Sequence, residues 1–315
     1  QVFSNNKFVG YALLIVVLVA QGVLDTLDFT HNLYNFGSWP IAPYSDMNGY
    51  GHFLTGQLAF QGYWLLLLLA LLLLSAALWV RGVGGGVRQR VALAKQRLHG
   101  RLGIATALAF TAFAAVGGWL FWNTNVRNEF VSPDQQLDLQ ARYEREYGKY
   151  KHLPQPKILA VSTHVDLRPE TQTMRVQGVY RVQNPYHNAI ADIHVQMVDD
   201  KALASIDLGG ARLLRHDGPI GYRIYRLDRP MQPGEQRDIR FDLDFHSNGI
   251  SNQVAQQQIV ANGTFVNSQM LPGFGYEPRA QISDRNERRK RGLGEPTRMP
   301  KLENQAARAS TYLTD

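Results

Sequence analysis

The chain has 315 residues, of which 45% are hydrophobic, and a formal net charge of +7 at pH 7. It contains no cysteine, which excludes a disulfide framework, a thiolate metal site and a cysteine nucleophile. The long apolar runs all end by Trp122, so we expect a membrane-embedded amino-terminal part and a water-exposed remainder. The first residue is Gln rather than Met, and we interpret the chain as a piece of a longer polypeptide.

Apolar runs in the first 127 residues predict a transmembrane region with three spans. A helix needs ~20 apolar residues to cross a hydrocarbon core of ~30 Å. The candidate spans are residues 8–24, 58–80 and 102–122, and the last two contain no charged side chain. The first run is the shortest and includes Gln21. A buried helix of a soluble protein is the alternative interpretation, and it applies chiefly to this first run.

The charges of the two connecting loops predict the direction of the spans. The loop 25–57 contains three aspartates and no Lys or Arg, whereas the loop 81–101 contains no acid. The basic residues of the second loop are Arg81, Arg88, Arg90, Lys95, Arg97 and Arg101. By the positive-inside rule this basic loop is cytoplasmic. We therefore expect a multi-pass protein of the inner cell membrane, with a cytoplasmic amino end and everything after Trp122 outside the cytoplasm.

The basic loop is typical of a helix lying on a membrane surface. Val91, Ala94 and Leu98 fall on one helical face, and the basic residues would meet anionic headgroups. We therefore predict the lipid bilayer, and no nucleic acid, as the partner of this loop. In the outer loop, His31, Asp46 and His52 could form a metal site, but their spacing does not require one. We expect interfacial hydrogen bonding there instead, and no metal in this chain.

A helix is predicted within residues 128–153, between the membrane region and the rest of the chain. The sequence SPDQ at 132–135 combines a capping serine, a first-turn proline and an acidic residue, which is typical of a helix start. Leu139, Tyr143 and Tyr147 share one stripe of this helix. Two interpretations remain open: a stalk between membrane and domain, or the ordinary first helix of that domain.

Residues 154–315 predict an extracytoplasmic, all-β domain. Side chains alternate with a period of two in residues 157–167, 174–183, 190–198, 222–227 and 239–245. Turn sequences lie between these runs, and Asn262-Gly263 between two apolar pairs predicts a hairpin over 259–266. Six to eight strands at this spacing indicate a mainly antiparallel sandwich or a saddle-shaped sheet. From about residue 272 we expect a long polar surface loop, with a solvated basic run at 285–291.

No complete catalytic constellation is found in the sequence. The motifs HExxH, GxSxG and GxxxxGK[ST] are absent, so no catalytic residue is assigned. His164, His194 and His246 lie on predicted strands, and the first two have an aspartate two residues away, on the same strand face. A zinc site needs three or four converging ligands. We therefore predict that these histidines are exposed on their strands.

Two stretches carry a resemblance to a known family. The run VDLRPETQTMRVQGVYRVQNPYHNAIADIHVQM resembles the opening strands of zinc aminopeptidases of the aminopeptidase-N type, whose amino-terminal domain is saddle-shaped. The run NGTFVNSQMLPGFGYEPRAQISDRNERRKRGL, preceded by the three candidate spans, resembles bacterial fusions of an ABC-transporter permease with an aminopeptidase-like part. The stretch 271–293 is the most specific piece, and the strand pattern alone is generic.

The resemblance implies a fold, partners and a weak substrate site. It implies that this chain holds the last transmembrane helices and the saddle domain, with an ABC ATPase subunit and other permease helices as partners. The family's zinc and HExxH motif lie in a following domain, so no cofactor is assigned to this chain. In the family, a Gln or Glu of the saddle domain holds the amino group of a peptide substrate. The nearest residues here are Asn262 and Thr264, which depart from that pattern.

The expected function is therefore to anchor and position an outward-facing peptidase-like domain of a longer protein. A non-catalytic envelope domain that binds a partner or a glycan is the first alternative. A transport component whose peptidase-like part has lost activity, and which captures substrate or gates transport, is the second. The three predicted spans contain almost no charge, so they offer no ion pathway of their own.

Overall fold

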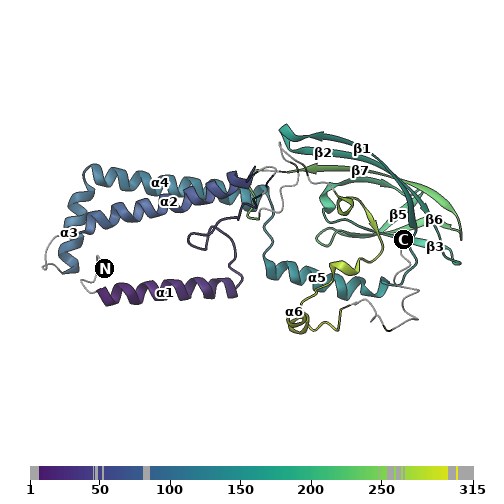
Figure 1. Ribbon diagram of the computed structural model, residues 1–315, viewed down its shortest axis with the longest axis horizontal. Coiled ribbons are helices and arrows are strands. Elements are labelled where there is room, and N and C mark those ends of the chain that lie inside the picture. The colour runs from purple at the N-terminus through teal and green to yellow at the C-terminus, as the bar shows by residue number, and fades with distance from the viewer. Residues whose placement is uncertain are drawn as a thin grey trace. The chain divides into compact units, whose positions relative to one another are not determined.

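The computed structural model describes residues 7–44, 46, 49–51, 53–80, 86–247, 249–253, 259, 264, 267–296 and 303 (Figure 1). The chain divides into two compact units. The first, called the helical unit, contains Gln1–Pro133, Arg168–Thr173 and His246–Phe265. The second, called the β unit, contains Asp134–Leu167, Met174–Phe245 and Val266–Asp315. Each unit is described by itself.

The helical unit is built from long apolar helices. Its elements are α1 (Lys7–Thr26), α2 (Phe53–Leu78), α3 (Val87–Leu98), α4 (Arg101–Phe121) and a π-helical turn, η1 (Trp122–Arg127). By length and composition, α2 and the continuous helix formed by α4 and η1 could each cross a membrane, and α1 contains a shorter apolar stretch, Phe8–Leu24. Leucine and alanine dominate α2, which suits a helix because both residues have high helix propensity.

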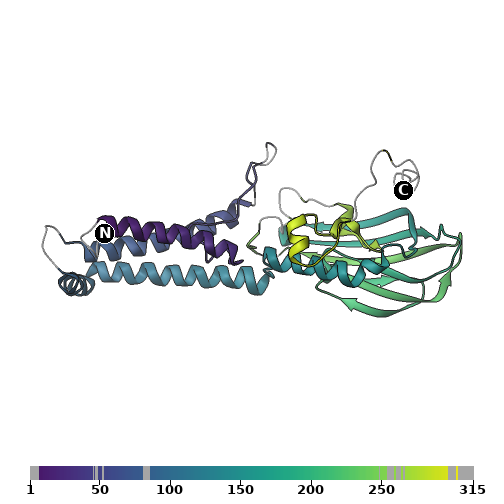
Figure 2. The same cartoon turned by 90° about the horizontal axis from the view of Figure 1, so that it is seen from below.

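The α2 and α4 helices lie side by side, joined at one end by α3 (Figures 1 and 2). Their contact depends on a close approach at Gly117. A Cβ atom added there would lie 2.8 Å from a ring carbon of Tyr63. The Tyr63 ring stacks on Phe113, with 4.5 Å between ring centroids. Small residues of this kind let two helices approach closely, as in membrane helix pairs.

The β unit consists of antiparallel sheets with helices packed beside them. Its strands are β1 (Lys157–Arg168), β2 (Thr173–Gln183), β3 (Ile190–Gln196), β4 (Leu203–Asp207), β5 (Ala211–Asp217), β6 (Tyr222–Met231), β7 (Gln236–His246) and β8 (Gly273–Phe274). Its helices are α5 (Pro133–Tyr147) and α6 (Arg285–Lys290). The described strands form two four-stranded sheets, in the orders β1-β2-β7-β4 and β5-β6-β3-β8. The prediction of a helical part followed by antiparallel β-structure is confirmed.

Alternate side chains of the central strands form the core of the β unit. In β2, Val176, Tyr180 and Val182 are buried, and in β7 the alternating residues from Ile239 are buried in the same way. Glycine is needed at position 178, since a Cβ atom there would lie 2.0 Å from the ring of Phe241. The alternation of apolar and polar residues predicted from the sequence therefore matches the alternation of buried and exposed side chains on these strands.

The sequence pattern did not indicate β4, β5 or the two-residue strand β8. The pairing of β5 with β6 contains a register shift between Leu213 and Arg215. An irregularity of this kind breaks the period of two, because one extra residue turns the following side chains to the other face. No residue of β5 is buried, and both Leu213 and Leu214 are exposed, so no alternation between a buried and an exposed face marks the strand.

The α5 helix is the packed first helix of the β unit, which decides between the two interpretations of the linker. Tyr143 and Tyr147 are buried in one cluster with Tyr222 and Ile224 of β6. The Tyr147 hydroxyl donates a hydrogen bond to Asp217 at 3.1 Å. A free stalk would leave this aromatic stripe in water. The predicted hairpin over 259–266 falls on residues that, apart from Ile259 and Thr264, lie outside the described part of the chain.

Candidate membrane-surface site

The basic residues predicted to face lipid lie in different environments on α3 and at the start of α4. Arg88, Lys95 and Arg101 are exposed. Arg90, in contrast, is buried, and it lies one turn before Ala94, which packs into the helical unit. Positions four residues apart share one helix face, so Arg90 follows Ala94 inward. This placement corrects the expectation of an exposed Arg90, and Arg81 lies outside the described residues.

Arg97 caps the end of α2. Its Nη1 donates to the backbone oxygens of Ala77 at 3.1 Å and Trp79 at 2.6 Å, with Ala76 at 3.4 Å. The last carbonyls of a helix have no partner within that helix and carry partial negative charge. A guanidinium placed there satisfies them and holds α3 against α2. The sequence shows a basic residue at this position, but not that its partners are backbone carbonyls about 20 residues earlier.

An apolar groove lies between α3 and the end of α2. Its volume is about 500 Å³, and it is lined by Leu74, Leu78, Val91, Ala94, Lys95, Leu98 and His99. Lys95 is the one lining residue with a full positive charge at neutral pH, and the Lys95 carbonyl accepts a hydrogen bond from His99 Nδ1 at 2.6 Å. An apolar lining beside the Lys95 ammonium group suits an amphiphilic molecule with an acidic headgroup. Chemically, this groove matches an acyl chain next to an anionic headgroup.

A buried histidine, His31, lies at the end of the helical unit opposite α3. The backbone N–H of Leu33 donates to His31 Nδ1 at 3.1 Å, so that nitrogen carries no proton. His31 Nε2 then donates to the Thr124 hydroxyl at 3.1 Å, and this hydroxyl donates to the Leu120 carbonyl. Burial lowers the pKa of His31 to about 4, so it is neutral at pH 7. Both ring nitrogens therefore take part in hydrogen bonds.

A metal site of His31, Asp46 and His52 gains no support. His31 uses both ring nitrogens in hydrogen bonds, and His52 lies outside the described residues. Within the described part of the chain, no three His, Asp or Glu side chains come close enough together to hold a metal.

The weak substrate-binding pair cannot be assembled from the described residues. Asn262 lies outside them. The Thr264 hydroxyl oxygen is buried and has no hydrogen-bond partner among the described residues, and this residue belongs to the helical unit rather than the β unit. The assignment of a substrate amino-group site to Asn262 and Thr264 therefore stays a prediction.

His194 corrects the expectation of exposed strand histidines. His164 and His246 are exposed as predicted, but His194 is buried. Its Nδ1 lies 2.9 Å from the Tyr222 hydroxyl, and its ring meets Tyr150 edge to face. Its sequence neighbour Asp192 does not join it, and instead binds Arg226 through Nη2 at 3.0 Å. The residues that cover His194 come from other elements, and the local sequence does not reveal them.

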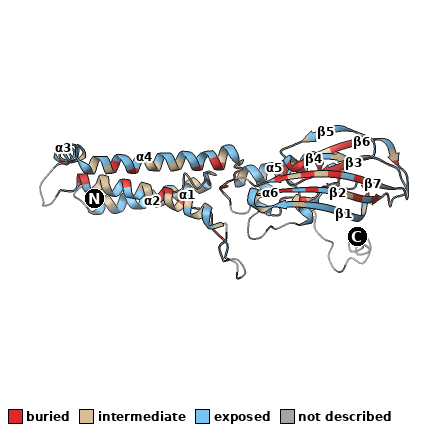
Figure 3. Ribbon diagram, turned by 90° about the horizontal axis from the view of Figure 1, so that it is seen from above, coloured by how far each residue is buried: buried red, intermediate tan, exposed pale blue. Residues whose placement is uncertain are grey.

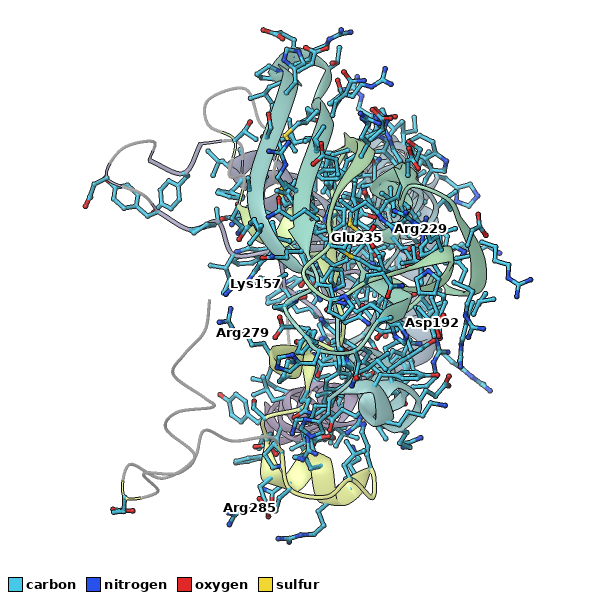
Figure 4. All side chains as sticks on the ribbon, turned by 90° about the vertical axis from the view of Figure 1, so that its right-hand side faces the viewer. Lys157, Asp192, Arg229, Glu235, Arg279 and Arg285 are labelled. Carbon is cyan, nitrogen blue, oxygen red and sulfur yellow. The ribbon has the colours of Figure 1, made fainter. Side chains whose placement is uncertain are left out.

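The basic run 285–291 is not the solvated loop that the sequence predicted. It forms α6, which lies beside α5 (Figures 1 and 2). Arg288 is buried and makes a two-pronged ion pair with Glu144, with both N–O distances at 2.8 Å. Arg291 donates from Nε to Asp138 at 2.7 Å. Arg285, labelled in Figure 4, remains exposed and points away from the unit.

Asp284 supplied a sequence signal for α6. Its carboxylate accepts the backbone N–H groups of Asn286 and Glu287, which is the hydrogen bonding of a helix N-cap. The spacing of Asp284 and Glu287 resembles a capping box. The dense positive charge after them conceals this signal, because it suggests a solvated segment.

Comparisons with known protein families, with curated protein sequences and with solved structures gave no match to this chain.

Proposed function

We propose that this chain is a membrane anchor that carries a β-domain outside the cytoplasm. In this proposal α1, α2 and α4 are three membrane spans, and α3 lies on the cytoplasmic membrane surface. The two sheets of the β unit form the extracytoplasmic sandwich or saddle. The observation that carries the proposal is the exposed apolar surface of the three helices, combined with the basic surface of α3.

Exposed residues recur along the helices of the helical unit (Figure 3), and many of them are large and apolar. In α4, Ile104 and Leu108 are each 64% exposed, and in α2 Leu65 and Leu72 are similarly exposed. In α1 every residue from 13 to 19 is exposed. Soluble proteins rarely leave contiguous apolar surface of this extent in water. If lipid hydrocarbon surrounds these helices, their apolar surface is not exposed to water.

The charges of α3 and of the first residue of α4 support the place of α3 on the cytoplasmic surface. Arg88, Lys95 and Arg101 are exposed, and the loop 81–101 contains no acidic residue to neutralise them. Basic residues close to a span are retained on the cytoplasmic side and attract anionic lipid. The apolar groove beside Lys95 supports the same assignment, because it accommodates an acyl chain next to a headgroup.

In the longer protein, the β unit would position a downstream peptidase-like domain. This part of the proposal rests on the resemblance to permease–aminopeptidase fusions, in which zinc is held by a following domain. It is supported by the packing of residues 271–293, which carry the most specific resemblance. A buried ion pair between Arg288 and Glu144 of α5 holds that stretch within the β unit.

Single cysteines test the orientation without background, since the chain has none of its own. Gln89→Cys places a thiol on α3, and Val198→Cys places one at a position 84% exposed in the β unit. A membrane-impermeant maleimide added to intact cells should label the Val198→Cys variant only. The Gln89→Cys variant should react after permeabilisation. Labelling of the Gln89→Cys variant from outside, or protection of the Val198→Cys variant, contradicts the proposed orientation.

Zinc content separates the positioning role from a purely binding role. The longer protein should contain about one zinc per chain and release amino-terminal residues from peptides if the downstream domain is a peptidase. A longer protein without zinc and without peptidase activity would favour the alternative, in which the β unit serves a non-catalytic binding or transport function.

A further inference from the structure

Strand β1 forms one edge of its sheet. In the order β1-β2-β7-β4 it has β2 on one side, and no described strand lies on its other side. The strand is 12 residues long, from Lys157 to Arg168, and Lys157 is labelled in Figure 4. Long edge strands present unpaired backbone donors and acceptors, so proteins usually shorten, charge or cover them.

Strand β1 is exposed along most of its length, on its apolar and on its polar face (Figure 3). Leu159 is 46% exposed, Val161 52%, Val165 44% and Leu167 39%. These residues alternate along the strand, so their side chains share one face. The sequence predicts a half-buried strand here, and the structure differs because nothing among the described residues covers this face. An apolar edge of this length is a site for pairing with another strand.

The exposed face reads the same in both directions about Thr163. Its side chains are Leu159, Val161, Thr163, Val165 and Leu167. A second copy of β1 placed antiparallel, with a two-fold axis at Thr163, sets Leu159 opposite Leu167 and Val161 opposite Val165. Directly opposed residues in an antiparallel pair make the closest side-chain contacts. The strand is therefore complementary to itself, as a two-fold interface requires.

The other face of β1 accepts the same register. The two-fold axis at Thr163 sets Ala160 opposite Asp166 and Ser162 opposite His164, so no two like charges meet. A shift of one residue would set Leu159 opposite Asp166 and Val161 opposite His164, so the apolar face of one copy would meet the polar face of the other. A shift of two residues would set Leu167 opposite Lys157 or Leu159 opposite Pro169, so only the axis at Thr163 pairs all five residues of the apolar face with one another.

We propose that β1 pairs antiparallel with β1 of a second copy of this chain, around a two-fold axis at Thr163. The pairing joins two four-stranded sheets into one continuous sheet across the dimer. This inference goes beyond the membrane-anchor function and does not depend on it, because the interface lies wholly on β1.

Disulfide cross-linking of the full-length chain in detergent tests both the pairing and its register. Opposed residues in an antiparallel pair have Cα atoms about 4.5–5.5 Å apart, within the range of about 4.4–6.8 Å that a disulfide spans. Thr163→Cys lies on the axis and should form a dimer by itself. Val161→Cys should not, because its own copies would be four residues, or about 14 Å, apart. A mixture of Val161→Cys and Val165→Cys chains should cross-link.

The Val198→Cys variant measures random collision, since this residue is exposed and distant in sequence from β1. We expect the Thr163→Cys dimer to form at least ten times faster than the Val198→Cys dimer. Equal rates, or self-cross-linking of Val161→Cys as fast as that of Thr163→Cys, would overturn the proposal. A Thr163→Cys chain that stays monomeric and is protected from maleimide would show that another part of the chain covers β1, which also overturns it.

Charge pairing provides a second test that needs no oxidant. Val161→Lys and Val165→Glu each place a charge opposite a valine of the second copy, so each variant alone should be monomeric by light scattering. Mixing the two variants brings the introduced lysine opposite the introduced glutamate and should restore a heterodimer. Both positions are exposed, so unchanged circular dichroism is expected. A mixture that stays monomeric while wild type is dimeric would disprove the register.

Discussion

The Arg288–Glu144 pair shows how a single buried charge can define a local structure. Both side chains are almost fully enclosed, and Arg288 also donates to the carbonyls of Ile282 and Gly294, each at 2.7 Å. The guanidinium thus satisfies the carboxylate and two backbone oxygens together. A buried ion pair adds little when compared with an apolar pair, but breaking it leaves an uncompensated charge.

Arg288→Met should destabilise the β unit by about 3–5 kcal/mol, because Glu144 would remain buried without its partner. Arg289→Met is the matched control, since Arg289 is exposed on the same helix, and it should change stability by less than about 0.5 kcal/mol. The double variant Arg288→Met/Glu144→Leu should regain much of the loss. Urea unfolding followed by far-ultraviolet circular dichroism measures all three. Equal effects of Arg288→Met and Arg289→Met would exclude a structural role for the pair.

His194 makes the stability of the β unit depend on pH. Burial lowers the pKa of His194 to about 4, against the opposing effect of Asp192. The unfolded chain therefore takes up the proton first as the pH falls. The stabilisation is fully present above about pH 6.5 and is lost as the pH falls through 4. One pKa unit corresponds to about 1.4 kcal/mol, so the loss is on the order of 3 kcal/mol.

His194→Gln should flatten this dependence, because the amide does not titrate and can still bond to the Tyr222 hydroxyl. The measurement is the free energy of unfolding of wild type and variant from pH 7 to pH 4. The difference between the two curves isolates His194 from every other titrating group. Parallel curves over this range would mean that His194 is not buried as a neutral side chain.

At the scale of elements, two adjacent glycines of α4 differ in their surroundings, and only one of them packs against another helix. A Cβ atom at Gly117 would lie 2.8 Å from the Tyr63 ring, whereas a Cβ atom at Gly118 meets nothing within 4 Å. The first glycine permits the contact between α2 and α4, and the second does not take part in it. Sequence inspection alone does not distinguish the two positions.

Gly117→Val should separate α2 from α4 and lower the melting temperature of the helical unit, with a cost of about 1–3 kcal/mol for an overpacked contact. Gly118→Val serves as the control of equal size and helix propensity, and it should have little effect. All five tryptophans lie before residue 123, so tryptophan fluorescence in detergent reports on this unit. Equal losses in the two variants would attribute the effect to helix propensity rather than packing.

The helices α5 and α6 show which helices a local sequence pattern can predict and which it cannot. The start of α5 at Pro133 agrees with the cap sequence at 132–135, because capping is a matter of a few neighbouring residues. The six residues of α6 are too few to be stable alone. The helix is held by the ion pair between Arg288 and Glu144 of α5, two residues more than 140 positions apart in the sequence. No local pattern encodes that contact.

At the scale of the whole molecule, the chain passes between its two units after residues 133, 167, 173, 245 and 265. The segment 246–265 follows β7 but belongs to the helical unit. There Ile250 is buried in a cluster with Phe60, Trp64 and Leu120. The Asn252 side chain accepts a hydrogen bond from the Asn32 backbone at 3.0 Å.

Ile250→Ala should loosen this segment, because removing a buried isoleucine costs about 2–5 kcal/mol. At 2 kcal/mol, hydrogen exchange of residues 247–253 should become about 30 times faster in the full-length chain. Ala substitution at Val198, which is exposed, should leave that exchange unchanged. Unaltered exchange in Ile250→Ala would show that the segment is held without this side chain.

The sequence by itself determined the kind of element along most of the chain. Hydrophobic run length indicates the long helices, and the period of two indicates β2, β3 and β7, because both properties reside in neighbouring residues. The tertiary structure alone decided what covers each element. It buried His194, Arg90 and Arg288, used Arg97 as a cap for α2, and left the apolar face of β1 exposed. These outcomes depend on contacts between residues far apart in sequence, and the free energy of those contacts has no local signature.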